Sequence, residues 1–167
     1  MAISSSGPAI SATVITLNEE RNIADCLKSV SWADEIVVLD SGSSDRTVEI
    51  AKRYTDKVFV EEWKGQGAHK NRAAELASGP WIFSIDADER ATPALGEAVR
   101  RAVASPDAVA YAFPRKNVYR GQWIKHGGWW PDKVKRLFLK DKARFNDKVI
   151  HDSVIADGAV GVIGEPI

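Results

Sequence analysis

The feature that most constrains the fold is a regular alternation of strand-like and helix-like segments up to about residue 104. Runs rich in β-branched and apolar residues predict strands at 10–16, 35–40 and 57–62, and a fourth that begins at residue 81 and ends in FSIDADE, residues 83–89. Helix-like segments follow these strands, at residues 17–30, 46–54, 68–79 and 93–103. The alternation predicts an α/β fold, in which right-handed crossover helices flank a mostly parallel sheet.

Several residues mark the ends of the predicted helices. Asn18 is predicted to cap the first helix, whose first turn carries two glutamates. Gly79 is predicted to end the third helix. Thr92 is predicted to cap the fourth, with Pro93 at its first position. Within the third segment, we interpret His69 as a surface or loop residue rather than a ligand.

Polar side chains follow three of the predicted strands. Asn18 and Glu19 come after the first, Asp40 ends the second, and Asp86 and Asp88 end the fourth. In parallel sheets, ligands bind at the carboxyl ends of the strands. An Asp-x-Asp pair offers hard oxygen ligands that suit Mg²⁺ or Mn²⁺ together with the phosphates of a substrate. The simpler interpretation is an acidic turn, but the other polar strand ends favour a binding site.

The chain changes character in its last third. Residues 109–117 alternate as a strand does, and 121–132, rich in Gly, Trp and charge, suit a binding loop. Residues 135–139 and 143–154 are predicted to form further short strands, antiparallel to their neighbours. The final stretch, 156–167, shows no clear element.

Charge is distributed unevenly. Residues 115–148 hold 11 Lys/Arg against 3 Asp/Glu, or +8, although the whole chain is neutral. This asymmetry indicates a basic patch for an anionic partner, such as a phosphorylated glycolipid or an anionic membrane leaflet. The alternative is a solvated basic face. Trp123, Trp129 and Trp130 lie in the same stretch and favour a sugar- or lipid-facing platform over a core role. No nucleic-acid recognition motif accompanies the charge, so we expect no nucleic-acid partner.

Composition and cysteine content indicate a soluble protein of a reducing compartment. The chain has 167 residues, 44% apolar and 28% charged, which fits one globular domain. Its single cysteine, Cys26, excludes an internal disulfide. We see no signal peptide at the start and no apolar run near the ~20 residues that span a bilayer. We therefore expect a cytoplasmic protein that can still contact the cytoplasmic face of a membrane.

Four motifs in this order resemble one enzyme family. TLNEERNIADCLKSV, EIVVLDSGSSDRT, the helix with Lys70–Asn71, and FSIDADE are similar to the inverting family-2 glycosyltransferases, which have a GT-A fold. Later residues resemble a branch that contains bacterial lipopolysaccharide-core glucosyltransferases: 128–132, 136–138 and 150–152. The resemblance covers residues 10 to about 155. It implies one domain, 1–167, with a nucleotide-sugar-binding half at 10–104 and an acceptor-side half at 105–155.

The resemblance implies a nucleotide-sugar donor, most often UDP-linked, and assigns residues to its nucleoside. Asn18 and Glu19 match the positions that follow the first strand and lie against the nucleoside. Asp40 matches the aspartate that accepts a hydrogen bond from the base. Leu17 stands where the family often has an aromatic residue, so the chain departs from the family at the position that stacks on the base.

The resemblance also assigns residues to the donor phosphates and the metal. Lys70 and Asn71 match a basic–Asn pair beside the donor. Asp86 and Asp88 match the pair that binds Mg²⁺ or Mn²⁺, with Asp88 nearer the metal. Such an ion would stabilise the charge that builds up on the leaving diphosphate.

Inversion at the sugar requires a carboxylate base on the face opposite the leaving group, which excludes both carboxylates of the Asp-x-Asp pair. Two candidates remain: Asp132, which follows the Trp-rich loop, and Asp152, which follows His151. We favour Asp132, because it resembles the acidic motif that usually supplies the base. For either residue the alternative is a surface aspartate beside a basic neighbour.

These inferences predict a metal-dependent transferase that moves a hexose, glucose first among the candidates, to a bacterial glycolipid or lipopolysaccharide core. The alternative is a non-catalytic nucleotide-sugar- or glycolipid-binding domain, because relatives usually continue beyond the position of Ile167 with a metal-contacting His and basic helices. On that comparison the chain is expected to be C-terminally truncated. A third interpretation, a receiver-like domain phosphorylated on Asp40, fits poorly with an Asn at position 18 and with the Asp-x-Asp pair.

Overall fold

The structure is a computed structural model that describes residues 9–120, 122–124, 132–146 and 152–167. Its helices are α1 (Ile23–Ser29), α2 (Thr47–Ala51), α3 (Gln66–Leu76) and α4 (Pro93–Ala104). Its strands are β1 (Ile10–Thr16), β2 (Glu35–Asp40), β3 (Val58–Val60), β4 (Trp81–Asp86), β5 (Ala110–Arg115), β6 (Val118–Tyr119), β7 (Gln122–Trp123), β8 (Asp132–Leu139), β9 (Ala143–Phe145), β10 (Val154–Ala156) and β11 (Val160–Val162).

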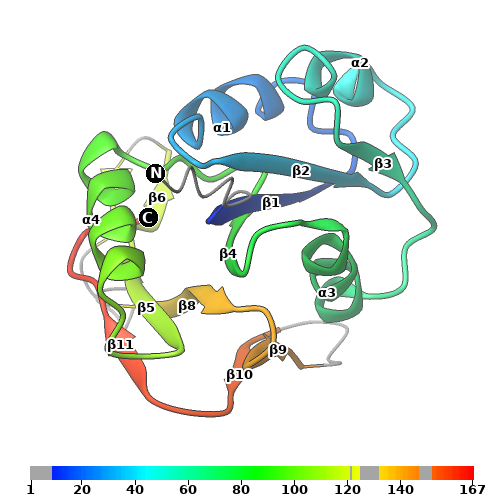
Figure 1. Cartoon of the computed structure of the whole chain (residues 1–167). Helices are drawn as coiled ribbons and strands as arrows, with labels where there is room; N and C mark the ends of the chain where they lie inside the picture. Colours follow the sequence, from blue (N-terminus) through cyan, green and yellow to red (C-terminus); the bar gives the residue numbers. More distant parts are fainter. Residues whose placement is uncertain (1–8, 121, 125–131, 147–151) are drawn as a thin grey trace, which may run out of the picture.

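A seven-stranded sheet forms the centre of the molecule (Figure 1), in the order β11-β5-β8-β4-β1-β2-β3. Strands β4, β1, β2 and β3 are parallel to one another, and β11 is parallel to β5. Strand β8 is antiparallel to both of its neighbours, β4 and β5. The predicted α/β class with a mostly parallel sheet is therefore confirmed, and the antiparallel element predicted near the C-terminus lies partly inside the main sheet.

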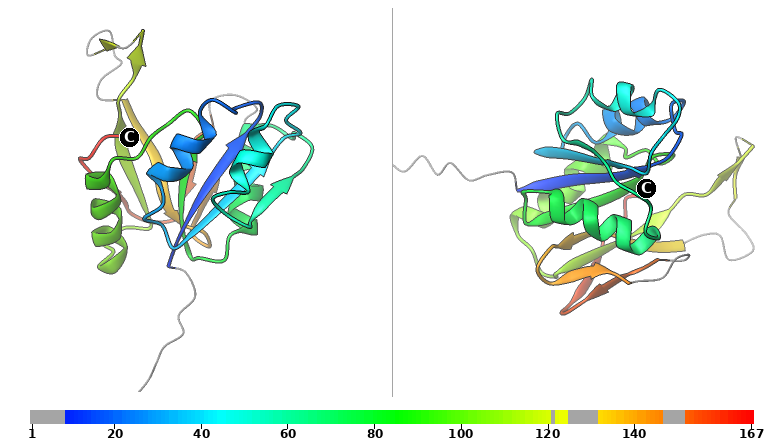
Figure 2. Two further views of the ribbon diagram at one scale, coloured as in Figure 1. Left: turned by 90° about the horizontal axis from the view of Figure 1, so that it is seen from above. Right: turned by 90° about the vertical axis from the view of Figure 1, so that its right-hand side faces the viewer.

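Helices and a small hairpin cover the two faces of this sheet. Helices α1, α2 and α4 pack on one face, where Phe83 and Val14 are buried with Leu27 and Leu95. Helix α3 and the antiparallel pair β9–β10 cover the other face, around Ile82 and Phe138. The separate hairpin β6–β7 stands away from the main body (Figure 2). The core is thus divided by the sheet into two apolar layers.

The predicted helix ends are right in one case and wrong in two. Thr92 caps α4, and its hydroxyl accepts a hydrogen bond from the Leu95 amide at 3.1 Å. Asn18 does not cap α1, because its backbone is left-handed (φ 54°) and the helix begins four residues later, after Asn22. Gly79 does not end α3: the chain is already extended at Ala77 and leads into β4.

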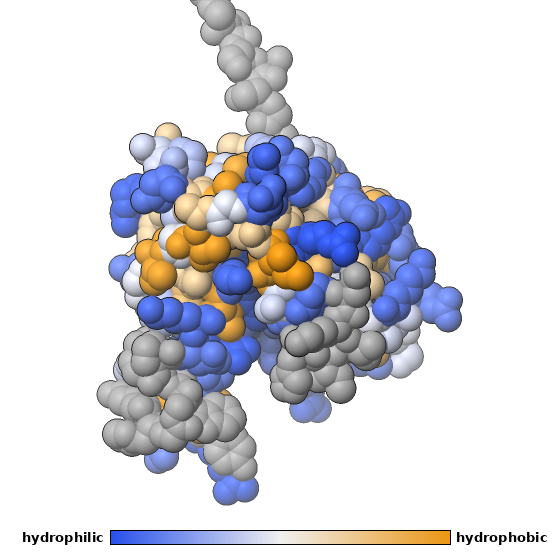
Figure 3. Space-filling view, turned by 90° about the horizontal axis from the view of Figure 1, so that it is seen from below, coloured by the Kyte–Doolittle hydropathy of each residue, from blue (hydrophilic) through white to orange (hydrophobic). Residues whose placement is uncertain are grey.

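The final stretch, for which the sequence shows no clear element, contains β11 and the end of β10. Both strands are three residues long. Strand β10 pairs with the nearby β9, and β11 exists through pairing with the distant β5. Local sequence carries little signal for such pairing. Three apolar side chains of these strands are exposed, Ile155, Val160 and Val162, and apolar residues gather on this side of the molecule (Figure 3).

Part of the predicted binding loop lies outside the described residues, including His126, Trp129 and Trp130, as does His151. Within the ranges that the structure describes, no helix is long and apolar enough to cross a membrane.

Candidate active site

The sheet register aligns the strand ends that carry the polar residues. Strand β1 lies between β2 and β4, with Thr16 opposite Asp40 and Ile15 opposite Asp86. The carboxyl ends of three neighbouring parallel strands therefore meet at one edge. This edge is where a parallel sheet binds its ligands, and the structure places the Asp-x-Asp pair there, at the end of β4 and next to β1.

Lys70 is buried at this edge and joins two carboxylates. Its Nζ atom lies 2.9 Å from Oδ1 of Asp86 and 3.1 Å from Oδ2 of Asp152. The side chain, which comes from α3, is only 2% exposed and lies 5.2 Å from the centre of the Phe145 ring. A buried ammonium requires such partners, so Lys70 links β4, α3 and the segment before β10.

Arg136 holds the other oxygen of Asp86. Its Nη2 atom donates to Oδ2 of Asp86 at 2.7 Å and to Oε1 of Glu89 at 2.9 Å. Strand β8 has a bulge at this point, where its register with β5 passes from Leu137 to Lys135 and leaves Arg136 unpaired across the strands. Bulges often re-aim side chains next to active sites.

Sequence reasoning assigned no role to Arg136 or Glu89. An arginine inside the apolar run of β8 is the signal that could have found them, because a buried guanidinium needs carboxylate partners. Glu89 provides one and also accepts a hydrogen bond from the Asp86 amide at 2.9 Å. The turn after β4 is therefore shaped by its own acidic residues.

The charges of this cluster shift one another's pKa values. Burial opposes ionisation of Asp86, but the cations of Arg136 and Lys70 outweigh it and lower the pKa to about 2. For Glu89 burial dominates and raises the pKa, although Arg136 acts in the opposite direction. Burial acts to lower the pKa of Arg136, yet Glu89 and Asp86 raise it above its ordinary range. Asp86 and Arg136 therefore form a permanent ion pair at neutral pH.

Three cavities meet at Asp86, which lines all of them. One, of about 400 Å³, lies over the ends of β1 and β4 and is bounded by Leu17 and Trp63. A second, of about 530 Å³, extends past Asp88 toward β5. A third, of about 500 Å³, contains Lys70, Asp152 and basic residues of β8. We call the first the nucleoside-side cavity, because it is lined by Glu19, which the sequence analysis expects against a nucleoside. We call the other two the middle and basic cavities.

Asp88 is the carboxylate that is free to bind a metal ion. It is exposed and lines both the nucleoside-side and the middle cavity. Among the described residues its side chain has no hydrogen-bond or ion-pair partner, whereas both oxygens of Asp86 are in ion pairs. The same residues contain no cluster of three metal-ligating side chains. This donor set suits Mg²⁺ or Mn²⁺, which take one or two carboxylates and complete their coordination with water and substrate phosphates.

The residues expected against the nucleoside link the loops that follow β1 and β2. Oδ1 of Asn18 accepts a hydrogen bond from the Ser44 amide at 2.8 Å. Asp40 is fully buried, and its carboxylate accepts three hydrogen bonds from residues 42 and 43. Glu19 lines the nucleoside-side cavity. Glu19 therefore lies against a cavity, while Asn18 and Asp40 bind the loop of residues 42–44.

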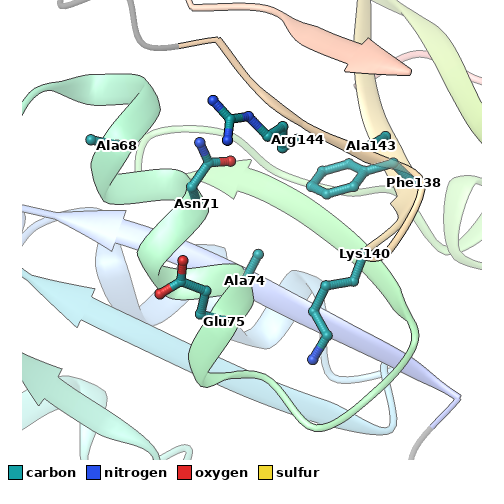
Figure 4. Close-up of a pocket in the computed structure, with 8 residues that line it drawn as sticks. All are labelled: Ala68, Asn71, Ala74, Glu75, Phe138, Lys140, Ala143 and Arg144. Atoms are coloured by element: carbon teal, nitrogen blue, oxygen red, sulfur yellow. The ribbon is translucent and has the colours of Figure 1, made fainter. Parts of the chain in front are cut away.

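Asn71 faces β9 rather than the cluster. Its Nδ2 atom donates to the Phe145 carbonyl at 2.9 Å, and its Oδ1 atom accepts from the Phe145 amide at 2.8 Å. A separate cavity of about 380 Å³ lies on this side of α3, between Asn71, Phe138 and Arg144 (Figure 4). No residue of the Asp86 cluster lines that cavity.

The two candidate bases differ in their surroundings. Asp132 begins β8, is 35% exposed, and accepts hydrogen bonds from Nε and Nη2 of Arg115 at 3.1 and 2.5 Å. Arg115 lines both the middle and the basic cavity. Asp152 is 9% exposed and is bound to Lys70. Asp132 is thus the more accessible carboxylate, and Asp152 is part of the buried cluster.

His69 is buried, so its interpretation as a surface or loop residue is wrong. It is 2% exposed within α3, and its Nε2 atom lies 3.0 Å from Oγ of Ser41. Its ring packs 5.2 Å from the ring of Trp63. Burial lowers the pKa of His69, so the imidazole is neutral at pH 7. His69 therefore supports two residues that line the nucleoside-side cavity.

This sheet, with its Asp-x-Asp pair and flanking cations, places the domain in the GT-A class of α/β folds, as solved structures confirm. Staphylococcus aureus TarS (residues 1–349) has a TM-score of 0.67 at 18% identity, and the match covers 93% of this chain and 58% of that one. The mannosyltransferase PcManGT from Pyrobaculum calidifontis, solved with GDP-Man and Mn²⁺, has a TM-score of 0.55 at 26% identity over 67% of this chain and 37% of its own.

The chain belongs to glycosyl transferase family 2, whose family model matches residues 11–158. A curated relative is the lipopolysaccharide core biosynthesis glycosyltransferase LpsC of Rhizobium meliloti. The two sequences are 33% identical over 163 residues, which cover 91% of this chain and 59% of LpsC. The chain therefore spans about three-fifths of that relative's length.

Proposed function

We propose that this domain transfers a hexose, with inversion, from a nucleotide sugar to a glycolipid or lipopolysaccharide-core acceptor, with the help of Mg²⁺ or Mn²⁺. One observation carries the proposal: the exposed carboxylate of Asp88 lines two adjoining cavities, beside an Asp86 that two buried cations hold ionised. Family membership and the solved PcManGT complex with GDP-Man and Mn²⁺ support the same conclusion.

In the proposed orientation the donor lies along this edge of the sheet. Its nucleoside occupies the cavity bounded by Leu17 and Glu19, and its diphosphate lies at Asp88. A divalent ion bound there would neutralise the charge of the leaving diphosphate as a Lewis acid. Lys70 and Arg136 keep Asp86 ionised and fixed, so the turn that presents Asp88 is already in place before the donor binds.

The acceptor then approaches from the middle and basic cavities. The basic cavity contains the exposed Lys133, and Lys135, whose Nζ atom donates to the Val154 carbonyl at 2.7 Å. Positive charge beside the acceptor site suits a phosphorylated glycolipid. The name of LpsC points to a lipopolysaccharide core as its class of acceptor.

We assign the general base to Asp132. Its side chain is 35% exposed, and it is held by Arg115, which lines both acceptor-side cavities. A base must reach the acceptor hydroxyl to accept its proton as the sugar is transferred. Asp152 is instead assigned to hold Lys70, because it is nearly buried against that ammonium.

The test is a screen of nucleotide sugars by thermal shift with and without Mn²⁺, followed by an assay of nucleotide release. A ligand that binds the native state raises the melting temperature. We expect a metal-dependent shift with one or a few donors, UDP-glucose first among them, and release of the nucleoside diphosphate. Metal-independent binding without turnover by the intact chain would instead indicate a non-catalytic binding domain.

A further inference from the structure

The nucleoside-side cavity has an aromatic wall that the sequence motifs did not assign. Trp63 lies in the loop between β3 and α3, and its side chain is 47% exposed although it is large and apolar. It lines the same cavity as Leu17, which is 51% exposed. Exposed apolar side chains that gather on one cavity, here of about 400 Å³, mark it as a candidate ligand-binding surface.

The buried His69 fixes the position of the Trp63 ring. The two rings pack with 5.2 Å between their centres, and His69 in turn contacts Oγ of Ser41 at 3.0 Å. Ser41 lines the cavity as well. A ring supported in this way loses little conformational entropy when a flat ligand stacks on it.

We infer that Trp63 is the residue on which the nucleobase of the donor stacks, in the place of the aromatic residue that Leu17 replaces. This inference rests on the proposed function, because it requires a nucleoside diphosphate with its phosphates at Asp88. Base–aromatic stacking tolerates different bases, since every base has a π-face. Trp63 therefore contributes affinity for the nucleoside, and the remaining polar contacts select the base.

Calorimetric titration of the intact chain in Mn²⁺ tests this assignment with two probes, UDP and inorganic pyrophosphate. Trp63→Ala is expected to weaken UDP binding about tenfold and to leave pyrophosphate binding unchanged, because pyrophosphate has no base. Trp63→Phe keeps an aromatic face and is expected to stay within about threefold of the wild type. Val60→Ala, an exposed residue of β3 outside the cavity, is the matched control and is expected to change neither.

The outcomes separate this inference from the proposed function. If Trp63→Ala binds UDP as the wild type does, and circular dichroism shows that its fold is intact, the assignment of Trp63 is wrong. The assignment of the diphosphate site would not be affected by that result. A wild type that binds neither probe would overturn the proposed function itself.

Discussion

Lys70 and Asp86 form a buried ion pair, with 2.9 Å between Nζ and Oδ1, at the edge of the sheet where three strands end. The same ammonium contacts Asp152 at 3.1 Å, and the other oxygen of Asp86 contacts Arg136 at 2.7 Å. Asp86 is thereby used for structure, and Asp88 is left exposed beside it. The two carboxylates of the Asp-x-Asp pair therefore have different tasks.

The first prediction concerns the stability that Lys70 provides. Lys70→Met leaves Asp86 and Asp152 without their shared cation, and removal of one partner from a buried pair costs about 3–5 kcal/mol. Urea unfolding should show this loss in the free energy of unfolding. Lys52→Met, at an exposed lysine, is the control and should stay within about 0.5 kcal/mol. An equally small change in Lys70→Met would contradict the structural role of the ion pair.

The arrangement of strands and helices could largely be predicted from the sequence, because each element of the first half has its own periodicity. The start of α4 at Thr92–Pro93 follows from the capping preferences of these two residues. The position of Asp86 and Asp88 beside the end of β1 follows because parallel strands end at the same edge of a sheet. The place of β8 between β4 and β5 could not be predicted. It depends on long-range pairing, and β8 is antiparallel to both neighbours.

The candidate site was predictable where a residue follows its strand directly, and not where the partner comes from a distant strand. Arg136 is separated from Asp86 by 50 residues and reaches it through a register shift in β8. The hydrogen bonds of Asn71 to β9 also span 74 residues. Such pairs depend on tertiary packing. The one sequence signal for them is an arginine within an apolar strand, which indicates a buried carboxylate partner.

The second prediction separates the two interpretations of Asn71. If its task is to hold Phe145 through two hydrogen bonds, Asn71→Ala should lower the free energy of unfolding by about 2 kcal/mol. Glu75→Ala, at an exposed position on the same helix, should change it by less than about 0.5 kcal/mol. A variant that keeps its full stability but loses affinity for the donor would instead place Asn71 against the nucleotide sugar.

The third prediction distinguishes the candidate bases. Asp132→Asn should lower kcat by about 100-fold or more while donor affinity stays unchanged, since a general base contributes 10²–10⁴-fold. Asp152→Asn should lower the melting temperature, because it removes a carboxylate from Lys70. Steady-state kinetics and thermal unfolding of both variants provide the check. A large loss of kcat in Asp152→Asn, without loss of stability, would exchange the two assignments.

The fourth prediction concerns acid sensitivity at His69. Burial, with a smaller contribution from Lys64, lowers its pKa in the folded state, while Glu61 and Asp40 act in the opposite direction. Below the ordinary value near 6.5 the unfolded chain binds a proton that the folded chain does not. The stability that the neutral imidazole contributes is therefore present above pH 6.5 and is lost as pH falls below it.

Thermal unfolding between pH 7.5 and 5.5 provides the measurement for His69. The melting temperature of the wild type should fall more steeply with decreasing pH than that of His69→Gln, which has no group to titrate at this position. Parallel pH dependences of the two proteins would show that His69 has the same pKa in both states, and would contradict its burial in neutral form.

The central claim is that the exposed carboxylate of Asp88 and a divalent ion together bind the diphosphate of a nucleotide sugar. Titration of UDP-glucose into the intact chain and into Asp88→Asn, each with and without Mn²⁺, measures this most directly. The account predicts tight binding only for the wild type with Mn²⁺, and a loss of at least about tenfold in the variant, whose melting temperature without ligand stays unchanged. Equal affinity of the two proteins for UDP-glucose in Mn²⁺ would contradict it.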